Sequence, residues 1–291
     1  MSWLEAIAVW GVLLYLVIQV VTVVVPHVCR RLDRNRHPGS YPAPDPPLGK
    51  AVLSIVREIA VKSILLGAVL LSQPFRGRIH RSGQGPLVVV VHGYMGSWMN
   101  FMCIMRRLVK AGFSVIGVDL GFDSPDVATQ ADRLGKTLDA VEGPAATPVL
   151  CAHSMGGLVS RYFANNLARG RVRGIITLGT PHSGTRMSRF ATPPARRDLA
   201  VNAEVQARLG SPADLGCPVL TIYSTFDQLV VPWTAARLPE PAEEFVVADL
   251  GHETLLVDSH CLDIIVNAAR RFHRQDAAPH PAVSGFPGRS G

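Results

Sequence analysis

The sequence predicts an α/β fold in which a doubly wound, mostly parallel sheet is preceded by an N-terminal transmembrane helix. Two observations lead to this prediction. Short β-branched runs alternate with helical patterns over residues 86–273, and an apolar run of membrane-spanning length stands near the N-terminus. Strands that are apolar on both faces are typical of parallel sheets covered by helices, and strand–helix alternation predicts a doubly wound sheet.

Short apolar runs are the expected strands of this sheet. The first is β-branched and has no polar alternation, as expected for a strand buried on both faces. The segments between the runs contain helical patterns, clearest where Val127, Ala131, Leu134, Leu138 and Val141 place one apolar face on a helix. The strands are expected at 86–91, 113–118, 149–150, 175–178, 219–223 and 245–247.

The composition indicates a folded protein and argues against nucleic-acid binding. Of the 291 residues, 48% are hydrophobic and 18% are charged, which is enough to bury a core. The formal net charge is +7, but the basic residues are scattered and no aromatic-basic stripe accompanies them. The five cysteines are an odd number without a C-x-x-C pair, so neither a disulfide framework nor a zinc knuckle is indicated.

The N-terminal segment predicts an uncleaved membrane anchor. From Ala6 to Val25 only Gln19 and Thr22 are polar, and a helix of this length spans about 30 Å, the thickness of a hydrocarbon core. A cleaved signal peptide would have a basic start and a small-residue cleavage site. A buried core helix would need a polar face, which this segment lacks. We therefore expect an anchor in a bacterial inner membrane.

A second apolar run leaves the topology of the anchor open. Four arginines lie between residues 30 and 36, and the positive-inside tendency places them in the cytoplasm. The second half of the run 51–71 is strongly apolar. Its first half contains Arg57, Glu58 and Lys62, a pattern that favours a helix at the membrane interface or packed on the body. If this run crosses the bilayer, the anchor is a hairpin and the body lies on the opposite side.

These segments define the expected organisation of the chain. The Pro-rich stretch after the anchor is predicted to be a semi-rigid spacer that does not fold. The C-terminal tail is rich in Pro, Gly, Ser and Ala and is predicted to be disordered. We expect an anchor at 1–29, a basic and Pro-rich linker at 30–50, an amphipathic or membrane-associated helical segment at 51–85, an α/β domain at 86–273 and a disordered tail at 274–291.

Ser154 is the predicted nucleophile. It stands between the strand run at 149–150 and a helical pattern, and Gly156 and Gly157 follow it. Small residues are needed there because a strained strand-to-helix turn brings neighbouring backbone close to the serine. Ala152 stands where the commoner G-x-S-x-G motif has its first glycine. A helix N-cap would also explain a serine, but not the glycines or the two partners further along the chain.

Asp227 and His252 are the predicted partners of Ser154. An attacking serine needs a base to take its proton and a carboxylate to hold that base in the right tautomer. In a sheet of this class the chain order is serine, acid, histidine. Asp227 and His252 each follow a predicted strand, at the carboxyl ends where catalytic groups collect.

Three other side chains are weaker candidates for the acid or the base. Asp249 is the alternative acid because it lies close to His252 in sequence. His153 is expected to point away from Ser154, and His182 follows the wrong strand to be the base. No H-E-x-x-H motif or EF-hand loop is present, so neither a catalytic metal nor a cofactor is predicted.

Two backbone N–H groups are expected to receive the negative charge that forms on the attacked carbonyl. The first belongs to Met155, directly after the nucleophile at a helix N-terminus. The second is expected from the glycine loop after the first strand, and the N–H of Tyr94 is the predicted donor. The insertion 183–214 is expected to form a short flap over an acyl pocket, to face anionic lipid or to be a solvated helix. We expect no large cap domain and a shallow pocket for medium acyl chains.

The motifs together resemble those of bacterial triacylglycerol lipases of the α/β-hydrolase superfamily. The Ala-x-Ser-x-Gly form is similar to that of the small Bacillus lipases. The resemblance covers roughly 86–273 and implies an α/β-hydrolase fold with Ser154, Asp227 and His252 as the triad. It also implies an oxyanion hole made by Tyr94 and Met155. The matching motifs are Val91–Tyr94, Ala152–Gly157, Leu178–Thr185, Tyr223–Asp227 and Gly251–His252.

These observations predict a membrane-anchored serine carboxylic-ester hydrolase, a lipase or esterase that acts on acylglycerols or other lipid esters. Lipases of the resembling group are secreted, whereas this chain keeps an anchor, so extracellular fat digestion is not implied. A thioesterase or acyltransferase would use the same residues. A catalytically silent, membrane-tethered binding module is the alternative from another class.

Overall fold

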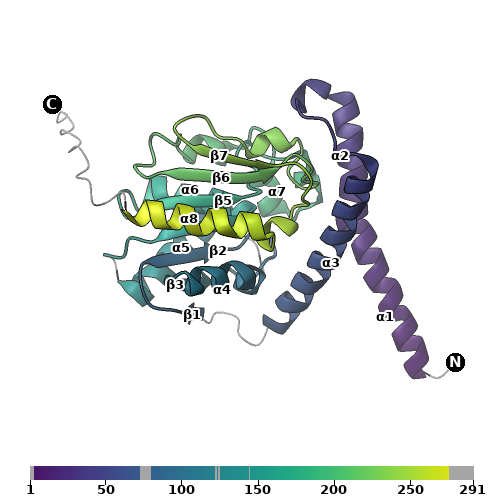
Figure 1. The fold of residues 1–291 in the computed structure, drawn as a ribbon, viewed down its shortest axis with the longest axis horizontal. Helices are drawn as coiled ribbons and strands as arrows, with labels where there is room; N and C mark the ends of the chain where they lie inside the picture. Colours follow the sequence, from purple (N-terminus) through teal and green to yellow (C-terminus); the bar gives the residue numbers. More distant parts are fainter. Residues whose placement is uncertain (1–2, 73–79, 122, 124, 144, 275–291) are drawn as a thin grey trace.

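The computed structural model describes residues 3–72, 80–121, 123, 125–143 and 145–274. The helices flank a seven-stranded sheet, and the first helices of the chain stand at one side of it (Figure 1). The strand order is β1-β3-β2-β4-β5-β6-β7. The strands are β1 (His80–Ser82), β2 (Leu87–Val91), β3 (Ser114–Val118), β4 (Val149–His153), β5 (Gly174–Leu178), β6 (Val219–Ser224) and β7 (Glu243–Val247).

The prediction of a doubly wound, mostly parallel sheet is confirmed. Neighbouring strands from β3 to β7 are parallel, and only β1 is antiparallel to its neighbour β3. Each of the six predicted strands is present, although β4 extends three residues beyond its apolar run. The short strand β1 lies in the segment predicted to be helical. Its sequence, His-Arg-Ser, has no apolar pattern that would reveal a strand.

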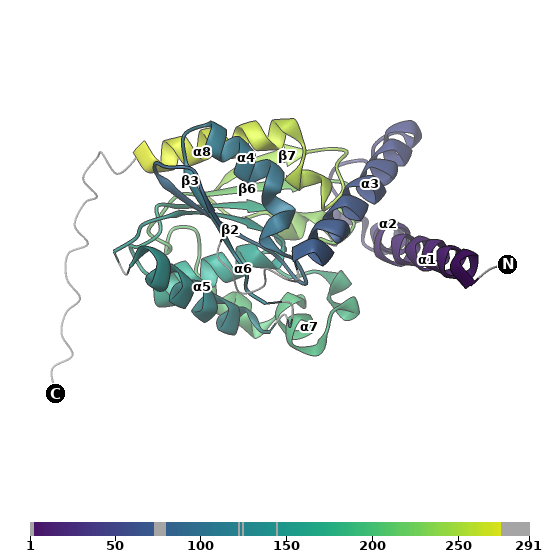
Figure 2. The same cartoon turned by 90° about the horizontal axis from the view of Figure 1, so that it is seen from below.

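Helices cover both faces of the sheet (Figure 2). The side chains of β2 alternate between two cores: Val89 and Val91 belong to one, Val88 and Val90 to the other. The first core includes side chains of α5 (Val127–Glu142) and α6 (Met155–Tyr162), and the second includes those of α4 (Met102–Lys110) and α8 (Ser259–Arg274).

The insertion after β5 contains α7 (Pro193–Leu199). The short 3-10 and π turns are η1 (Val20–Val24), η2 (Pro38–Ser40), η4 (Trp98–Phe101), η5 (Phe163–Leu167), η6 (Arg186–Phe190), η7 (Glu204–Arg208), η8 (Trp233–Ala236) and η9 (Thr254–Leu256).

One long helix begins the described chain. It runs through α1 (Trp3–Gln19), η1 and α2 (Val25–Arg36) without a break. Within the described residues, only the stretch Val9–Arg36 is long and apolar enough to cross a membrane. An anchor and a signal sequence both satisfy that criterion. The second N-terminal helix, α3 (Leu48–Ser72), packs on the body, where its Leu65 joins the core on the α4 and α8 side of the sheet.

The segment expected to be an unfolded linker, 30–50, is folded against the body. Residues 30–36 belong to α2, and Arg30 is only 2% exposed. The Arg30 guanidinium forms an ion pair with Asp45, donates to the carbonyl of Thr225 at 2.8 Å and lies over the ring of Phe226. The sequence pattern did not reveal this arrangement because Thr225 and Phe226, which bury Arg30 against the body, are distant in the chain. The predicted disordered tail lies, apart from residue 274, outside the described residues.

Candidate active site

The turn between β4 and α6 holds Ser154 in a strained backbone conformation. Its φ is 56° and its ψ is −129°, and residues other than glycine rarely adopt such positive φ values. The Ser154 N–H donates to the carbonyl of Leu178 at 2.9 Å, which fixes the turn to the end of β5. A Cβ atom added to Gly93 would lie 2.8 Å from the Cβ of Ser154, so the loop after β2 also packs directly on this turn.

Asp227 and His252 form a buried pair at the ends of β6 and β7. Asp227 Oδ2 accepts a hydrogen bond from His252 Nδ1 at 2.7 Å. The other oxygen, Oδ1, accepts from the backbone N–H groups of Leu229 and Val230 at 2.7 and 2.9 Å. Asp227 is 1% exposed and His252 is 2% exposed. The carboxylate is therefore fixed in orientation, and it determines which way the imidazole faces.

The electrostatics of this pair suit a general base. Burial disfavours the charge on Asp227, but His252 and the two backbone N–H donors together lower the pKa of the carboxyl group. Burial alone would lower the pKa of His252, yet the Asp227 carboxylate raises it above the usual histidine value. A raised pKa makes the neutral imidazole a stronger proton acceptor. The pair can thus hold His252 with its proton on Nδ1 and its Nε2 lone pair free.

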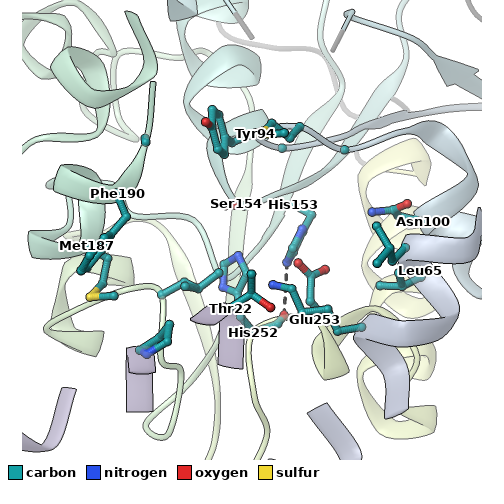
Figure 3. A pocket seen from close by; sticks show the side chains of 18 of the residues that line it. Thr22, Leu65, Tyr94, Asn100, His153, Ser154, Met187, Phe190, His252 and Glu253 are labelled. Atoms are coloured by element: carbon teal, nitrogen blue, oxygen red, sulfur yellow. Dashed lines mark hydrogen bonds between the residues drawn. The ribbon is translucent and has the colours of Figure 1, made fainter. Parts of the chain in front are cut away.

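Ser154 and His252 line one cavity of about 670 Å³ (Figure 3). No hydrogen bond joins the Ser154 hydroxyl to His252 in the described part of the chain. Catalytic hydrogen bonds are often long before substrate binds and tighten only in the reacting complex. The structure brings Ser154 and His252 to the same cavity, and Asp227 is joined to His252 behind it.

The two predicted oxyanion donors follow Gly93 in the loop after β2 and Ser154 in the turn after β4, and these two segments pack on each other. Among the described residues, the backbone N–H groups of Tyr94 and Met155 have no hydrogen-bond partner. The loop that carries Tyr94 is held by His92, whose Nδ1 donates to the Gly93 carbonyl at 2.9 Å and whose Nε2 accepts from the Leu120 N–H at 2.9 Å. The Tyr94 hydroxyl accepts from the Thr192 N–H at 3.1 Å, which ties the side chain to the insertion. Free N–H groups on a rigid loop are what an oxyanion hole requires.

Comparison with known proteins supports the same fold. The family model described as "alpha/beta hydrolase fold" matches residues 86–212. This chain has the α/β-hydrolase fold. The sequence matches no curated protein.

Solved structures of lipases share this fold. The lipase BlEst2 of Bacillus licheniformis is 18% identical over 67% of this chain and 98% of its own, with a TM-score of 0.55. Lipase B of Aspergillus fumigatus is 18% identical over 66% of this chain and 56% of its own, with a TM-score of 0.56. A monoacylglycerol lipase of Paleococcus ferrophilus is 15% identical over 67% of this chain and 99% of its own, with a TM-score of 0.52. At such identities, the resemblance to lipases holds at the level of the α/β-hydrolase fold.

The position of His153 differs from the expectation. Its side chain does not point away from the site but lines the cavity of the α/β-hydrolase core, where its Nε2 donates to the His252 carbonyl at 3.2 Å (Figure 3). The two imidazole rings lie 4.5 Å apart. Burial, together with the neighbouring His252, lowers the pKa of His153 to about 4. His153 is thus a neutral hydrogen-bond donor at neutral pH and supports the backbone of His252.

The other lower-ranked side chains do not join the candidate site. His182 is buried beside Thr177 and Arg161 and does not line the cavity. Asp249 does not contact His252, whose Nδ1 is occupied by Asp227. Among the described residues, no group of three or more His, Cys, Asp or Glu side chains is arranged to hold a metal ion.

A carboxylate from outside the α/β-hydrolase core holds the loop that carries His252. Glu58 of α3 is fully buried. One of its oxygens accepts from Gln228 Nε2 at 2.7 Å and from the Glu253 N–H at 2.9 Å. The other accepts from the Thr254 N–H at 3.0 Å and from the Thr254 hydroxyl at 2.6 Å. In the sequence, Glu58 stands in a run predicted to be an amphipathic helix, and nothing in that pattern linked it to His252.

The cavity has walls from the insertion and from the N-terminal helices as well as from the sheet, which a shallow pocket on the α/β domain alone would not have. The insertion contributes Met187, Phe190 and Leu199 to one wall, so part of it covers the cavity as the flap interpretation expected. The N-terminal helices contribute the opposite wall, with Val21 before α2 and Leu66 on α3 among its residues. No large cap domain is needed beside the candidate site because these helices lie next to it (Figures 1 and 3).

Proposed function

We propose that the protein is a membrane-anchored serine hydrolase that cleaves carboxylic esters of lipids, such as acylglycerols, through an acyl-enzyme on Ser154. The observation that supports this most strongly is the buried Asp227–His252 pair at 2.7 Å beside a serine with positive φ on the same cavity. That constellation is the acid–base–nucleophile arrangement of serine hydrolases. A silent binding module would not need a strained serine beside a base of raised pKa.

The proposed reaction has two halves. His252 Nε2 takes the Ser154 hydroxyl proton as the serine oxygen attacks the ester carbonyl, and the N–H groups of Tyr94 and Met155 receive the oxyanion. His252 then gives its proton to the leaving alkoxide, which departs as an alcohol and leaves the acyl group on Ser154. Water attacks that acyl group in the second half, again with His252 as base. Each oxyanion donor typically contributes about 2.7–4 kcal/mol to lowering the barrier.

The anchor in this proposal is the apolar helix Val9–Arg36. Its length and hydropathy support a single span, and the packing of α3 on the body argues against a second one. The catalytic body at 86–273 then lies at a bacterial inner membrane, and the substrate class that fits an anchored hydrolase is a lipid ester. Thioesters and acceptor alcohols are tested as alternative substrates because they would use the same residues.

A fluorophosphonate probe on the full-length protein in detergent tests the proposal. We expect the wild type to be labelled covalently at Ser154 and Ser154→Ala to lose the label. Ser183→Ala, which alters an exposed serine outside the cavity, is the matched control and keeps the label. Wild-type protein that takes no label and hydrolyses no ester would contradict the proposal and favour a binding module.

A further inference from the structure

The cavity beside Ser154 has a wall that the α/β core does not supply. Ile18, Val21 and Val25 line it from the first long helix, and Leu66 and Leu70 line it from α3. The wall is therefore mainly apolar where it is built from the N-terminal helices. An apolar wall directly beside a nucleophile favours the hydrocarbon part of a substrate.

The same residues connect the cavity to the outer surface of the helices. Val21 is 56% exposed and Leu70 is 62% exposed, although both line the cavity. The two helices are joined at this level because Tyr15 and Gln19 both hydrogen-bond to Ser63, at 2.7 and 2.9 Å. The exposed side chains that the structure describes on α1 are mostly apolar, among them Trp10, Leu14 and Val17, as a helix in a bilayer requires. The opening of the cavity is thus continuous with the surface that would contact lipid.

We propose that α1, η1 and α3 form the site for the acyl chain, and that the substrate is a long-chain lipid that enters this site directly from the bilayer. This inference rests on the proposed function, because it assigns the chain of the same ester whose carbonyl meets Ser154. The acyl chain then remains in apolar surroundings from the membrane to the nucleophile. A substrate arriving from water would have to cross the apolar rim first.

Paired variants on α3 test the acyl site. Leu66 lines the cavity, whereas Ile64 is 72% exposed and does not line it. For Leu66→Trp we expect the ratio of kcat/KM for the 4-nitrophenyl decanoate ester to that for the acetate ester to fall about tenfold or more, the effect of excluding roughly two methylenes. For Ile64→Trp the ratio stays within about twofold of the wild type. An unchanged ratio in folded Leu66→Trp, or an equal fall in both variants, would overturn the inference.

Vesicles test the route of entry. Full-length protein is reconstituted into phosphatidylcholine vesicles that contain a long-chain diacylglycerol, or into empty vesicles that are mixed with diacylglycerol vesicles. We expect hydrolysis at least tenfold faster when enzyme and lipid share a bilayer. Equal rates would overturn entry from the bilayer. The proposed function is judged separately, because a wild type that takes the probe and cleaves the acetate ester is a serine hydrolase whatever the vesicles show.

A second inference comes from a different observation, the four hydrogen bonds to Glu58. They use both carboxylate oxygens, and their donors belong to the segments that carry Asp227 and His252. Gln228 extends the network, because its Oε1 accepts from the His252 N–H at 3.0 Å. A Cβ atom on Gly251 would lie 2.3 Å from a Glu58 oxygen, so the loop closes tightly over the carboxylate.

We infer that Glu58 is a positioning residue for the same proposed reaction, and that α3 is part of the active site. Glu58 itself does not line the cavity. It acts on His252 through the backbone at residues 252–254. Its charge also raises the pKa of His252, together with those of Asp227 and Glu253, while burial lowers it. Lys62 of α3 faces Glu253.

Glu58→Gln tests this role against Arg57→Gln, which alters the exposed neighbouring residue. The NH₂ group of the glutamine would face N–H or O–H groups that now donate to the Glu58 carboxylate, so the loop that carries His252 would shift. We therefore expect kcat for ester hydrolysis to fall about tenfold or more, with KM within about twofold of the wild type. Loss of the negative charge also lowers the pKa of His252, so the acid limb of the pH–kcat/KM profile moves to lower pH. Arg57→Gln leaves kcat unchanged.

A milder variant keeps the test informative if Glu58→Gln does not fold. Thr254→Val removes only the hydroxyl donor, and we expect a few-fold loss of kcat with no movement of the acid limb. Folded Glu58→Gln with wild-type kcat and an unmoved acid limb would overturn the positioning role. Wild-type kcat in Thr254→Val would overturn it as well. Absence of ester turnover in the wild type would instead contradict the proposed function.

Discussion

Asp227→Asn is expected to lower kcat for ester hydrolysis about 10⁴-fold. In the structure, Oδ1 of Asp227 accepts from two backbone N–H groups, at Leu229 and Val230. The asparagine oxygen would take that position, and its NH₂ group would replace Oδ2 and face His252 Nδ1. Nδ1 would then accept a hydrogen bond, and the proton would move to Nε2. An imidazole with its proton on Nε2 cannot take the proton of Ser154.

Steady-state kinetics with a 4-nitrophenyl ester across the acid range measures this effect. Because Asp227 raises the pKa of His252, the wild type loses activity as the pH falls through that raised pKa and the base becomes protonated. The residual activity of Asp227→Asn should therefore show its acid limb at lower pH. Asp249→Asn is the control and should retain wild-type kcat within about twofold. A large loss in Asp249→Asn with little loss in Asp227→Asn would contradict the assignment.

The fold and the triad candidates were predictable because strand ends leave clear signals in this sequence. The runs before Ser154, Asp227 and His252 are apolar on both faces, and the carboxyl ends of parallel strands meet at one edge of a sheet. The order of the three residues along the chain then suffices to group them. No other long-range information is needed to select these three residues as candidates from the sequence.

The orientation of His153 needed information that one strand does not contain. Side chains alternate along β4, so His153 shares a face with Cys151. Cys151 lies in the core beside α4 and α8, which also holds Leu250 and Leu255 on either side of His252. The alternation was readable in the sequence, but the face on which the His252 loop packs was not.

Glu58 and Arg30 were missed for a related reason. Both are charged residues in N-terminal segments that resemble a membrane-associated helix and a solvated linker. Both are buried against the loops after β6 and β7, nearly two hundred residues away, which supply the Thr225 carbonyl to Arg30 and the Glu253 N–H to Glu58. From the local sequence pattern, an isolated charged residue is predicted to be exposed, since burying a charge without a partner is costly. Only the tertiary structure reveals the partner that removes the cost.

Gly156→Ala is expected to destabilise the protein by about 3 kcal/mol and to reduce kcat about 100-fold. A Cβ atom at residue 156 would lie 2.3 Å from the Val91 carbonyl oxygen and 2.6 Å from that of His92. Both atoms belong to backbone, so no side-chain rotation relieves the clash, and α6 must move away from β2. That movement separates Met155 from Tyr94 and displaces Ser154 from His252.

Thermal unfolding and ester kinetics measure the two effects together. Gly135→Ala is the matched control. Gly135 lies within helix α5, and a Cβ atom there meets only the ring of Phe163, at 3.1 Å. Alanine is favoured over glycine in a helix by about 1 kcal/mol, so we expect this control to change the free energy of unfolding by no more than that and to keep kcat. If Gly156→Ala kept wild-type stability and kcat, the close contact between the Ser154 turn and β2 would not determine the geometry of the site.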